Sequence, residues 1–332
     1  MKTIKKITLF MLVAMFTLIA GIVGGCAKSG KSTNLADVNM PVLEDTRGTE
    51  MQMNTITTLN GNEVSYNMNT RKIVCIFGSQ DVVAFGIKLL AYEASTDIKG
   101  YESYYDGATA LKDSTPFSAE EVYSYEPELI LVNQQMTSED IGTLSKIAPV
   151  IPLYTDSTSF ETRLRFIGNV FGLQEHAETL IKYAADLKDT MLANMQELNI
   201  QDKTLTMFTY FGAITIPPQR GWFMNVILYD YLGIKRLDIV KEFMEDESGI
   251  AYEGISSENL INYEGDLVIY AGFGETTITT FVSENPGWQA LKAVREDRVG
   301  VIDITPYVQK GVILLYNQYA QILNALKTAA KI

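Results

Sequence analysis

The stretch FSAEEVYSYEPELILV, residues Phe117 to Val132, has a counterpart in the second half of the chain: ISSENLINYEGDLVIY, residues Ile255 to Tyr270. Aligned at an offset of 138 residues, the two stretches share identical residues, among them Glu120 with Glu258, Tyr125 with Tyr263, Glu126 with Glu264, and Leu129 with Leu267. Each copy reads as a short helix, a turn at Pro127 or Gly265, and then a buried strand. The repeat indicates duplicated architecture.

A second repeat lies upstream of each copy. KIVCIFGSQDVVAFGIK, Lys72 to Lys88, reads as a strand, a glycine, a helix and then Gly-Ile-Lys. LTMFTYFG, Leu205 to Gly212, is again a strand that ends in glycine, and after an insertion the chain reaches LYDYLGIK, Leu228 to Lys235. Because strands alternate with helices in both halves, we expect two α/β lobes with mostly parallel central sheets flanked by helices.

The segment Leu173 to Leu198 separates the two halves and has the pattern of one amphipathic helix. Its apolar residues recur at steps of three and four: Leu180, Ala184, Leu187, Met191, Met195 and Leu198. Gly172 is a natural end for the preceding helix, and the segment spans roughly 39 Å at 1.5 Å per residue. We therefore predict lobes over 51–172 and 199–332, joined by one long backbone helix over 173–198, with a ligand cleft between the lobes.

The amino-terminal segment contains a phosphate-loop pattern, since Gly25 to Ser32 satisfies G-x-x-x-x-G-K-[ST]. The uncharged run Ile7 to Val23 before it is far longer than a strand, and the chain begins with a lysine-rich region. This order is typical of a secretory signal, and Val23-Gly24-Gly25-Cys26 resembles the lipobox of bacterial lipoproteins. We predict a signal peptide over 1–26 with lipidation at Cys26, and a flexible tether over 27–50.

Charge and composition exclude several classes of function. Without residues 1–26 the chain has 24 basic and 40 acidic residues, a net charge of −16, which disfavours nucleic-acid binding. The single histidine, His176, lies in a helical stretch, so zinc sites and histidine-dependent catalysis are improbable. Cys75 lies in an apolar strand-like run and is read as a small buried thiol.

Taken in order, these features resemble a known family: the helical-backbone substrate-binding lipoproteins of ABC importers, which capture iron–siderophore complexes, haem or cobalamin. The hairpin-and-strand segment ITTLNGNEVSYNMNTRKIVCI is similar to the family's opening, and EEVYSYEPELILV is similar to its E-x-I-x-x-L-x-P-D-L-I segment, with Glu128 in place of aspartate. INYEGDLVIY is close to a segment of Gram-positive ferric-hydroxamate binders, and NPGWQALKAVREDRVGVID resembles the family's closing segment.

The resemblance gives Glu120 and Glu258 a specific meaning, because each lobe of this family presents one glutamate that docks on arginines of the permease. A structural reading is compatible with this role. Ser118 and Ser256 are natural N-caps, which places both glutamates in a first helical turn, where a carboxylate complements the helix dipole.

Ligands of open α/β sheets bind beyond the carboxyl ends of the strands. That rule nominates cleft residues in loops of both lobes, although aromatic residues there also serve as packing. The candidates are Ser79, Gln80, Tyr101, Tyr104, Tyr105, Asn133, Gln134, Tyr210, Arg220, Trp222, Phe273 and Tyr307.

Arg220 and Trp222 lie in an inserted Pro-rich loop, and the resemblance to hydroxamate binders favours them as ligand contacts. An arginine donates to the oxygens around a chelated ferric ion, and a tryptophan face packs on the carbon skeleton. Few basic residues occur in the nominated loops, which disfavours anionic ferric catecholates and favours ferric hydroxamates. Haem and cobalamin remain alternatives.

The resemblance implies a non-enzymatic, monomeric protein without an intrinsic cofactor or direct metal ligand. Its implied partners are a ferric siderophore, a permease dimer with a cytoplasmic ATPase, and the membrane through the lipid anchor. The implied location is extracytoplasmic, on the outer face of a Gram-positive cytoplasmic membrane. A lipid-anchored surface enzyme or adhesin is the alternative from another class, but no acid–base pair is evident in the sequence.

Overall fold

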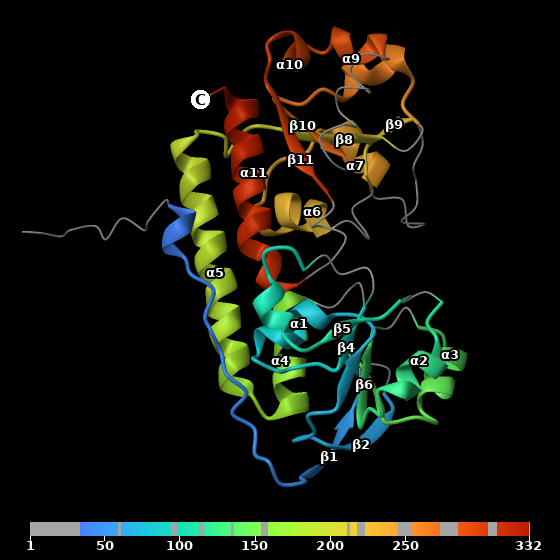
Figure 1. The fold of residues 1–332 in the computed structure, drawn as a ribbon. Helices are drawn as coiled ribbons and strands as arrows, with labels where there is room; N and C mark the ends of the chain where they lie inside the picture. The colour runs from blue at the N-terminus through green and yellow to red at the C-terminus, as the bar shows by residue number, and fades with distance from the viewer. Residues whose placement is uncertain are drawn as a thin grey trace, which may run out of the picture. The chain divides into compact units, whose positions relative to one another are not determined.

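The computed structural model describes residues 34–58, 61–93, 98–112, 116–133, 136–153, 159–210, 213–217, 223–244, 254–272, 285–304 and 311–331. These residues belong to one compact unit, Thr33–Ile332, and the predicted signal peptide with Cys26 lies outside them. Figure 1 shows two α/β sheets connected by long helices. The predicted α/β fold class is confirmed.

The first sheet has five parallel strands in the order β5-β4-β3-β6-β7. The strands are β3 (Ile73–Cys75), β4 (Ala91–Tyr92), β5 (Thr109–Ala110), β6 (Leu129–Val132) and β7 (Val150–Pro152). Side chains alternate between its faces, as the strand period of two requires. Leu129 and Leu131 pack with the core that includes the long helices, whereas Ile130 and Val132 pack with Val122 of α2 (Ala119–Ser124).

The second sheet has the order β11-β10-β8-β9, with all pairs parallel except the edge pair β8 and β9. Its strands are β8 (Leu205–Tyr210), β9 (Ile214–Thr215), β10 (Leu267–Gly272) and β11 (Val299–Asp303). Thr204, directly before β8, forms a parallel bridge with Lys235. Lys235 therefore lies beside β8 as β4 lies beside β3. The order β4-β3-β6-β7 therefore recurs as Lys235-β8-β10-β11.

The offset of 138 residues seen in the sequence holds in three dimensions. Helix α2 and the 3₁₀ helix η4 (Ser257–Tyr263) begin at equivalent residues, and so do β6 and β10. Both Gly-Ile-Lys segments place their glycine in the left-handed region, with φ of 79° at Gly86 and 68° at Gly233. The two halves are thus copies of one supersecondary unit, as the sequence predicts.

The predicted connecting helix is present as α5 (Gln174–Glu197), and Gly172 ends the preceding helix α4 (Phe160–Phe171) with φ of 67°. The apolar stripe of α5 is buried at Leu180, Leu187 and Met191. The C-terminal helix α11 (Leu315–Ala330) packs against both α5 and the second sheet. These two long helices connect the core of the first half to that of the second.

The remaining elements are short and are placed around the sheets (Figure 1). They are η1 (Leu35–Asp37), the antiparallel hairpin β1 (Met53–Thr57) and β2 (Glu63–Asn67), α1 (Ser79–Ala84), η2 (Glu102–Tyr105), α3 (Ser138–Leu144), α6 (Phe223–Asn225), the π-helix η3 (Val226–Tyr231), α7 (Asp238–Met244), α9 (Pro286–Ala290), α10 (Lys292–Arg295) and η6 (Val312–Leu314). The opening hairpin is therefore as predicted.

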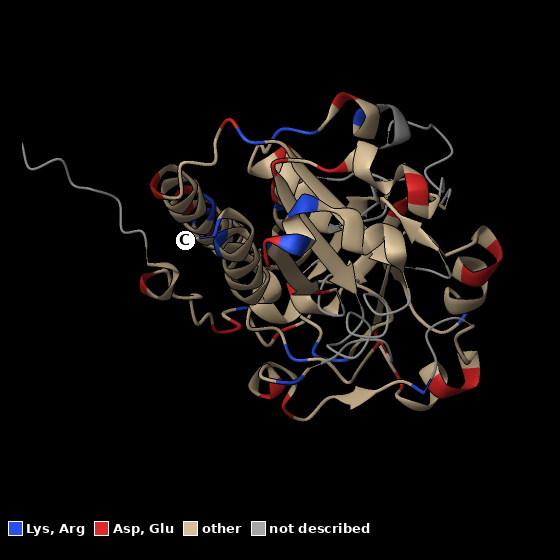
Figure 2. Ribbon diagram, turned by 90° about the horizontal axis from the view of Figure 1, so that it is seen from above, with Lys and Arg blue, Asp and Glu red and all other residues tan. Residues whose placement is uncertain are grey.

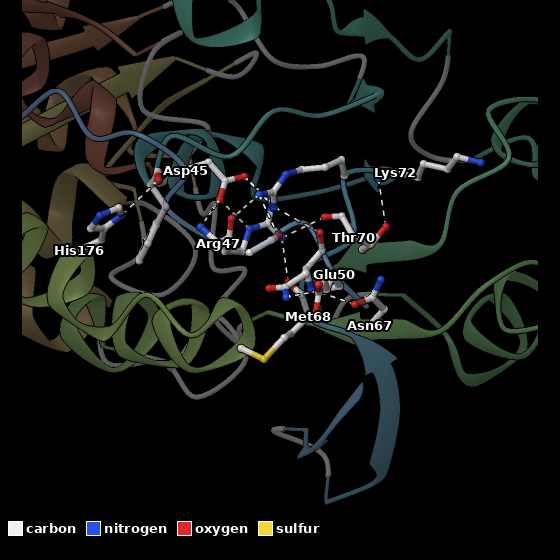
Figure 3. A network of polar contacts seen from close by, with 12 residues as sticks. Asp45, Arg47, Glu50, Asn67, Met68, Thr70, Lys72 and His176 are labelled. Carbon is white, nitrogen blue, oxygen red and sulfur yellow. Dashed lines mark hydrogen bonds and ion pairs between the residues drawn. The ribbon is translucent and has the colours of Figure 1, made fainter. Parts of the chain in front are cut away.

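Residues 34–50, which the sequence predicts as part of a flexible tether, are instead packed against the protein. We call this segment the strap. The Arg47 side chain is buried and donates to Asp45 at 2.7 and 2.8 Å and to the carbonyls of Met68 and Thr70 at 3.0 Å (Figure 3). Its guanidinium also lies over the Phe171 ring, 4.8 Å from the ring centroid. The prediction was wrong here because polar composition hides a buried, fully partnered arginine.

The strap crosses α1 where that helix ends. A Cβ at Gly86 would lie 2.5 Å from the Leu43 carbonyl oxygen and 2.9 Å from the Asp45 nitrogen. Only a residue without a side chain allows this approach. The glycine of the first Gly-Ile-Lys segment therefore serves both the helix end and the packing of the strap.

Candidate functional site

The carboxyl ends of the two sheets are brought together by a contact between α1 and η6. Helix α1 follows β3 of the first sheet, and η6 follows β11 of the second. The Val312 amide donates to Asp81 Oδ1 at 2.8 Å, and a Cβ at Gly311 would lie 2.1 Å from Gln80 Cβ. Since ligands of open α/β sheets bind at these ends, the contact marks the place where a shared site is expected.

Asp81 is the charged centre of this contact. It is fully buried on α1 and forms an ion pair with Arg163 of α4, whose side chain is 3% exposed. A buried ion pair needs further hydrogen bonds to offset desolvation, and the Val312 amide supplies one from the second half of the chain. Asp81 therefore ties the segment after β11 to the first lobe.

Three predicted ligand residues, Ser79, Gln80 and Tyr105, are clustered beside this contact but are buried. The Tyr105 hydroxyl lies 3.0 Å from Ser79 Oγ, and burial raises the pKa of Tyr105 well above its usual range. The buried carboxylate of Glu93 accepts from the amides of Gly78 and Ser79 at 3.1 Å. The cluster therefore shapes the turn after β3.

Tyr101 and Tyr104, also predicted as ligand contacts, line a cavity of about 310 Å³ together with Tyr183 of α5 and Tyr316 of α11. Asn317 donates to the Tyr101 hydroxyl at 2.5 Å, and burial together with the neighbouring Tyr104 raises the pKa of Tyr101 to about 12. Strap residues 36 and 38–40 form another wall. The structure thus places these two tyrosines beside the long helices rather than with Ser79.

The other described candidates follow strands of both sheets. Asn133 comes directly after β6 and is 7% exposed, whereas Tyr210 ends β8 and is 38% exposed. Tyr210 therefore has the most accessible side chain near the carboxyl end of a central strand. The candidates that lie outside the described residues are Gln134, Arg220, Trp222, Phe273 and Tyr307.

Glu120 and Glu258 lie in the first turns of α2 and η4, and both are exposed. Ser118 caps α2 as predicted, accepting from the Glu121 amide at 3.2 Å. Ser256 occupies the N-cap position of η4 as predicted, but its side chain makes no cap hydrogen bond. In the second copy Ser257 instead donates to Asn285 Oδ1 at 2.6 Å, so the segment beginning at Asn285 fixes η4.

That closing segment has its own structural basis. Gly287 approaches so closely that a Cβ would lie 2.0 Å from the Ser257 carbonyl oxygen. Trp288 is 1% exposed and packs edge-on against Phe208 of β8 and Tyr270 of β10, with ring centroids 5.7 and 5.9 Å away. The motif resembling the family's closing segment is therefore a core element of the second lobe.

A cavity of about 640 Å³ lies at the opposite end of the second sheet. Its carboxylates already have partners: Asp266 accepts from Thr204, and Glu264 accepts from the amides of Lys292 and Ala293. Because this groove lies before the amino ends of β8 and β10, it is not the expected ligand edge. The described residues contain neither a group of acids, histidines and cysteines arranged around a metal ion nor a helix of the length and apolarity of a membrane span.

Cys75 and His176 both pack against the rest of the protein. Cys75 is fully buried, as predicted, and burial raises the pKa of its thiol. His176 is half-buried on α5 with Nδ1 3.3 Å from the Phe85 carbonyl oxygen. Sequence reasoning missed Asp81, Glu93 and Arg163, and the signal available for Asp81 was a carboxylate directly before the apolar run 82–85.

The sequence profile described as periplasmic binding protein matches residues 94–305. A relative, the iron-uptake system-binding protein of Bacillus subtilis (strain 168), is 26% identical over 199 residues, which are 58% of this chain and 60% of that protein's length. The iron(3+)-hydroxamate-binding protein FhuD of the same organism is 26% identical over 229 residues, covering 68% of this chain and 70% of FhuD.

Solved structures show the same fold. One is a FhuD fold-family periplasmic binding protein component of a Fep/Fec-like ferrichrome ABC transporter from Bacillus subtilis. It superposes with a TM-score of 0.68 at 22% identity and covers 83% of this chain and 100% of its own. The profile match extends over more than half of the sequence, so the chain belongs to the periplasmic binding protein family.

Proposed function

We propose that this chain is the extracytoplasmic substrate-binding protein of an ABC importer, and that it captures a ferric siderophore and delivers it to a membrane permease. The observation that carries the proposal is the contact of α1 with η6. It joins the carboxyl ends of two sheets whose parallel cores have equivalent orders, β3-β6-β7 and β8-β10-β11, and α/β proteins bind ligands at such ends. A site shared by two lobes can enclose a chelate of several hundred Å³.

The relatives support the class of ligand. One is named for iron uptake and the other for iron(3+)-hydroxamate binding, and both match over more than half of this chain. The solved structure supports the fold alone at its level of identity. Iron in such a complex is held by the chelator, so the protein needs no metal ligands of its own.

Charge favours the hydroxamate type of siderophore. The chain without residues 1–26 has a net charge of −16, and Figure 2 shows carboxylate residues distributed over many helices and loops. A strongly anionic ferric catecholate would be repelled by such a surface, whereas a ferric hydroxamate of nearly neutral charge would not. Arg220 and Trp222 of the inserted loop are the proposed contacts, together with Tyr210 and Phe273.

Delivery requires a docking surface, which we assign to Glu120 and Glu258. They occupy equivalent exposed positions, one in each lobe, and fit arginines presented by two subunits of a permease that works with a cytoplasmic ATPase. Acylation of Cys26 would hold the protein at the outer face of the cytoplasmic membrane. Since residues 34–50 are packed as the strap, the proposed tether does not include them.

Fluorescence titration of residues 27–332 tests the proposal. Ferrioxamine B, which is a ferric hydroxamate, should bind with saturation at one equivalent, and its iron-free form and a ferric tris-catecholate should bind more weakly. Haem and cobalamin should be titrated in the same way, as the alternative ligands. Tighter binding of the catecholate would reject the hydroxamate assignment, and binding of haem or cobalamin alone would reject the siderophore.

Docking is tested separately. The variant Glu120→Ala/Glu258→Ala should bind ferrioxamine B with unchanged affinity but fail to support uptake in cells that lack the native copy. A loss of affinity, or uptake at the wild-type rate, would contradict the docking role. A surface enzyme or an adhesin would give no reason for paired glutamates to affect uptake.

A further inference from the structure

An exposed apolar side chain accompanies each of the two glutamates. Tyr123 of α2 is 68% exposed and Ile261 of η4 is 54% exposed. Tyr123 is three residues after Glu120 and Ile261 is three residues after Glu258, so the two are equivalent at the same offset of 138. The repeated feature is thus a carboxylate followed by a large apolar residue.

Burial at most positions around these residues is repeated, at 118–120 and 122–125 in the first copy and at 256–258 and 260–263 in the second. Val122 and Leu260, each directly before the exposed apolar residue, are fully buried and anchor their helices to the two cores. The residues on either side of each glutamate–apolar pair show the same order of exposed and buried positions in both copies. Both lobes therefore present the same face of an equivalent helix to solvent.

Exposed apolar residues that occur singly are ordinary on protein surfaces. Among the described residues, the large apolar side chains that are exposed are Val42, Met51, Met53, Tyr123, Tyr210, Ile239, Ile261 and Val301. In this set Tyr123 and Ile261 form the pair that the internal repeat relates. A side chain kept both exposed and apolar at the same place in two copies indicates a contact surface.

The helix geometry places each apolar side chain next to its glutamate. Residues three apart are neighbours on an α-helix and are eclipsed on a 3₁₀ helix. The pairs Glu120–Tyr123 and Glu258–Ile261 therefore each form one small patch. Neither α2 nor η4 contains a lysine or an arginine, so both patches are acidic and apolar.

We propose that Tyr123 and Ile261 are the apolar half of the permease-docking surface; this proposal rests on the proposed function. Each patch fits a pocket lined by basic and apolar side chains, and the partner presents this pocket twice because the patch occurs once in each lobe. An exposed ion pair alone adds little affinity, since water and salt screen it. An apolar contact beside it excludes water and makes the ion pair effective.

Uptake measurements in cells that lack the native copy test the proposal with the full chain. The variant Tyr123→Ser/Ile261→Ser should lower uptake of radiolabelled ferrioxamine B by about tenfold, the change expected for loss of hot-spot contacts. Binding of the same ligand to cells on ice should be unchanged. Met53→Ser and Val301→Ser, which alter an equally exposed apolar residue in each half, should leave both measurements unchanged.

Wild-type uptake by the double variant, with failure of Glu120→Ala/Glu258→Ala, would overturn this inference and leave the proposed function intact. A wild-type protein that captures no ferric siderophore would instead overturn the proposed function. A photo-crosslinking amino acid placed at Tyr123 or Ile261 provides an arm that needs no siderophore. It should crosslink to a membrane-spanning permease subunit, unlike the same probe at Met53 or Val301, and equal crosslinking from all four positions would contradict the docking surface.

Discussion

The repeat provides a matched pair of glycines with which the packing of the strap can be measured. Gly86 and Gly233 occupy the same place in the two Gly-Ile-Lys segments, and both have a positive φ. They differ in surroundings: a Cβ at Gly86 would lie 2.5 Å from the Leu43 carbonyl oxygen, whereas a Cβ at Gly233 would meet nothing within 4 Å. Alanine at each position therefore separates backbone strain from collision with the strap.

The expected loss of stability on substitution by alanine has two contributions, backbone strain and collision with the strap. The left-handed conformation costs an alanine about 1–2 kcal/mol at either site, and reduced freedom of the unfolded chain offsets part of this equally. At Gly86 the collision is with backbone atoms, which cannot rotate away, so the strap must move at a further cost of about 1–3 kcal/mol. Gly86→Ala should thus destabilise the protein by about 1–3 kcal/mol more than Gly233→Ala.

Thermal and urea unfolding of the two variants would measure the difference. For a compact unit of 300 residues, each kcal/mol corresponds to roughly 1.5 °C in Tm, so Gly86→Ala should unfold about 2–5 °C below Gly233→Ala. Hydrogen exchange over residues 40–50 should be faster in Gly86→Ala alone. Equal shifts in Tm and unchanged exchange would refute the packing of the strap on α1.

Three further predictions concern the strap and the ligand. Arg47→Ala should lower the free energy of unfolding by about 3 kcal/mol, because two carbonyls lose their donor and the half-buried Asp45 carboxylate loses one of its two arginine partners, whereas Arg165→Ala, which breaks an exposed pair, should have little effect in the same urea titration. Burial raises the pKa of Asp45, but the hydrogen bond and charge of Arg47 outweigh burial and lower that pKa below 3.8. The ionised Asp45 side chain should therefore stabilise the protein above about pH 4, and this stabilisation should be lost as the pH falls further. In acid, the free energies of unfolding of wild type and Asp45→Asn should converge. Trp222→Phe should remove most of the fluorescence change on adding ferrioxamine B, since Trp288 is buried between Phe208 and Tyr270; an undiminished change would place the ligand elsewhere.

Much of the fold was predictable because the sequence contains an internal repeat. The offset of 138 residues located α2, η4, β6 and β10, and the apolar stripe of α5 marked the connecting helix. Both signals are local and periodic, so they survive without knowledge of tertiary contacts. The 3₁₀ form of η4 was not predictable, because Ser257 is held by Asn285, which is distant in sequence.

The sequence predicted only those parts of the candidate site that follow the ends of strands. Ser79, Gln80 and Tyr105 follow strands as expected, but sequence alone gives no sign that Gly311 closes over Gln80 or that Glu93 organises the turn. The strap was missed for a similar reason. Arg47 looks like a surface residue until the carbonyls of Met68 and Thr70, more than twenty residues away, become its acceptors.

Anomalous diffraction at the iron absorption edge, from crystals grown with ferrioxamine B, tests the central claim most directly. A single iron peak is expected at the carboxyl ends of β3, β6, β8 and β10, within reach of Tyr210 and the loop that carries Arg220 and Trp222. An iron peak in the cavity lined by Tyr101 and Tyr104, or the absence of any peak at saturating ligand, would contradict the account.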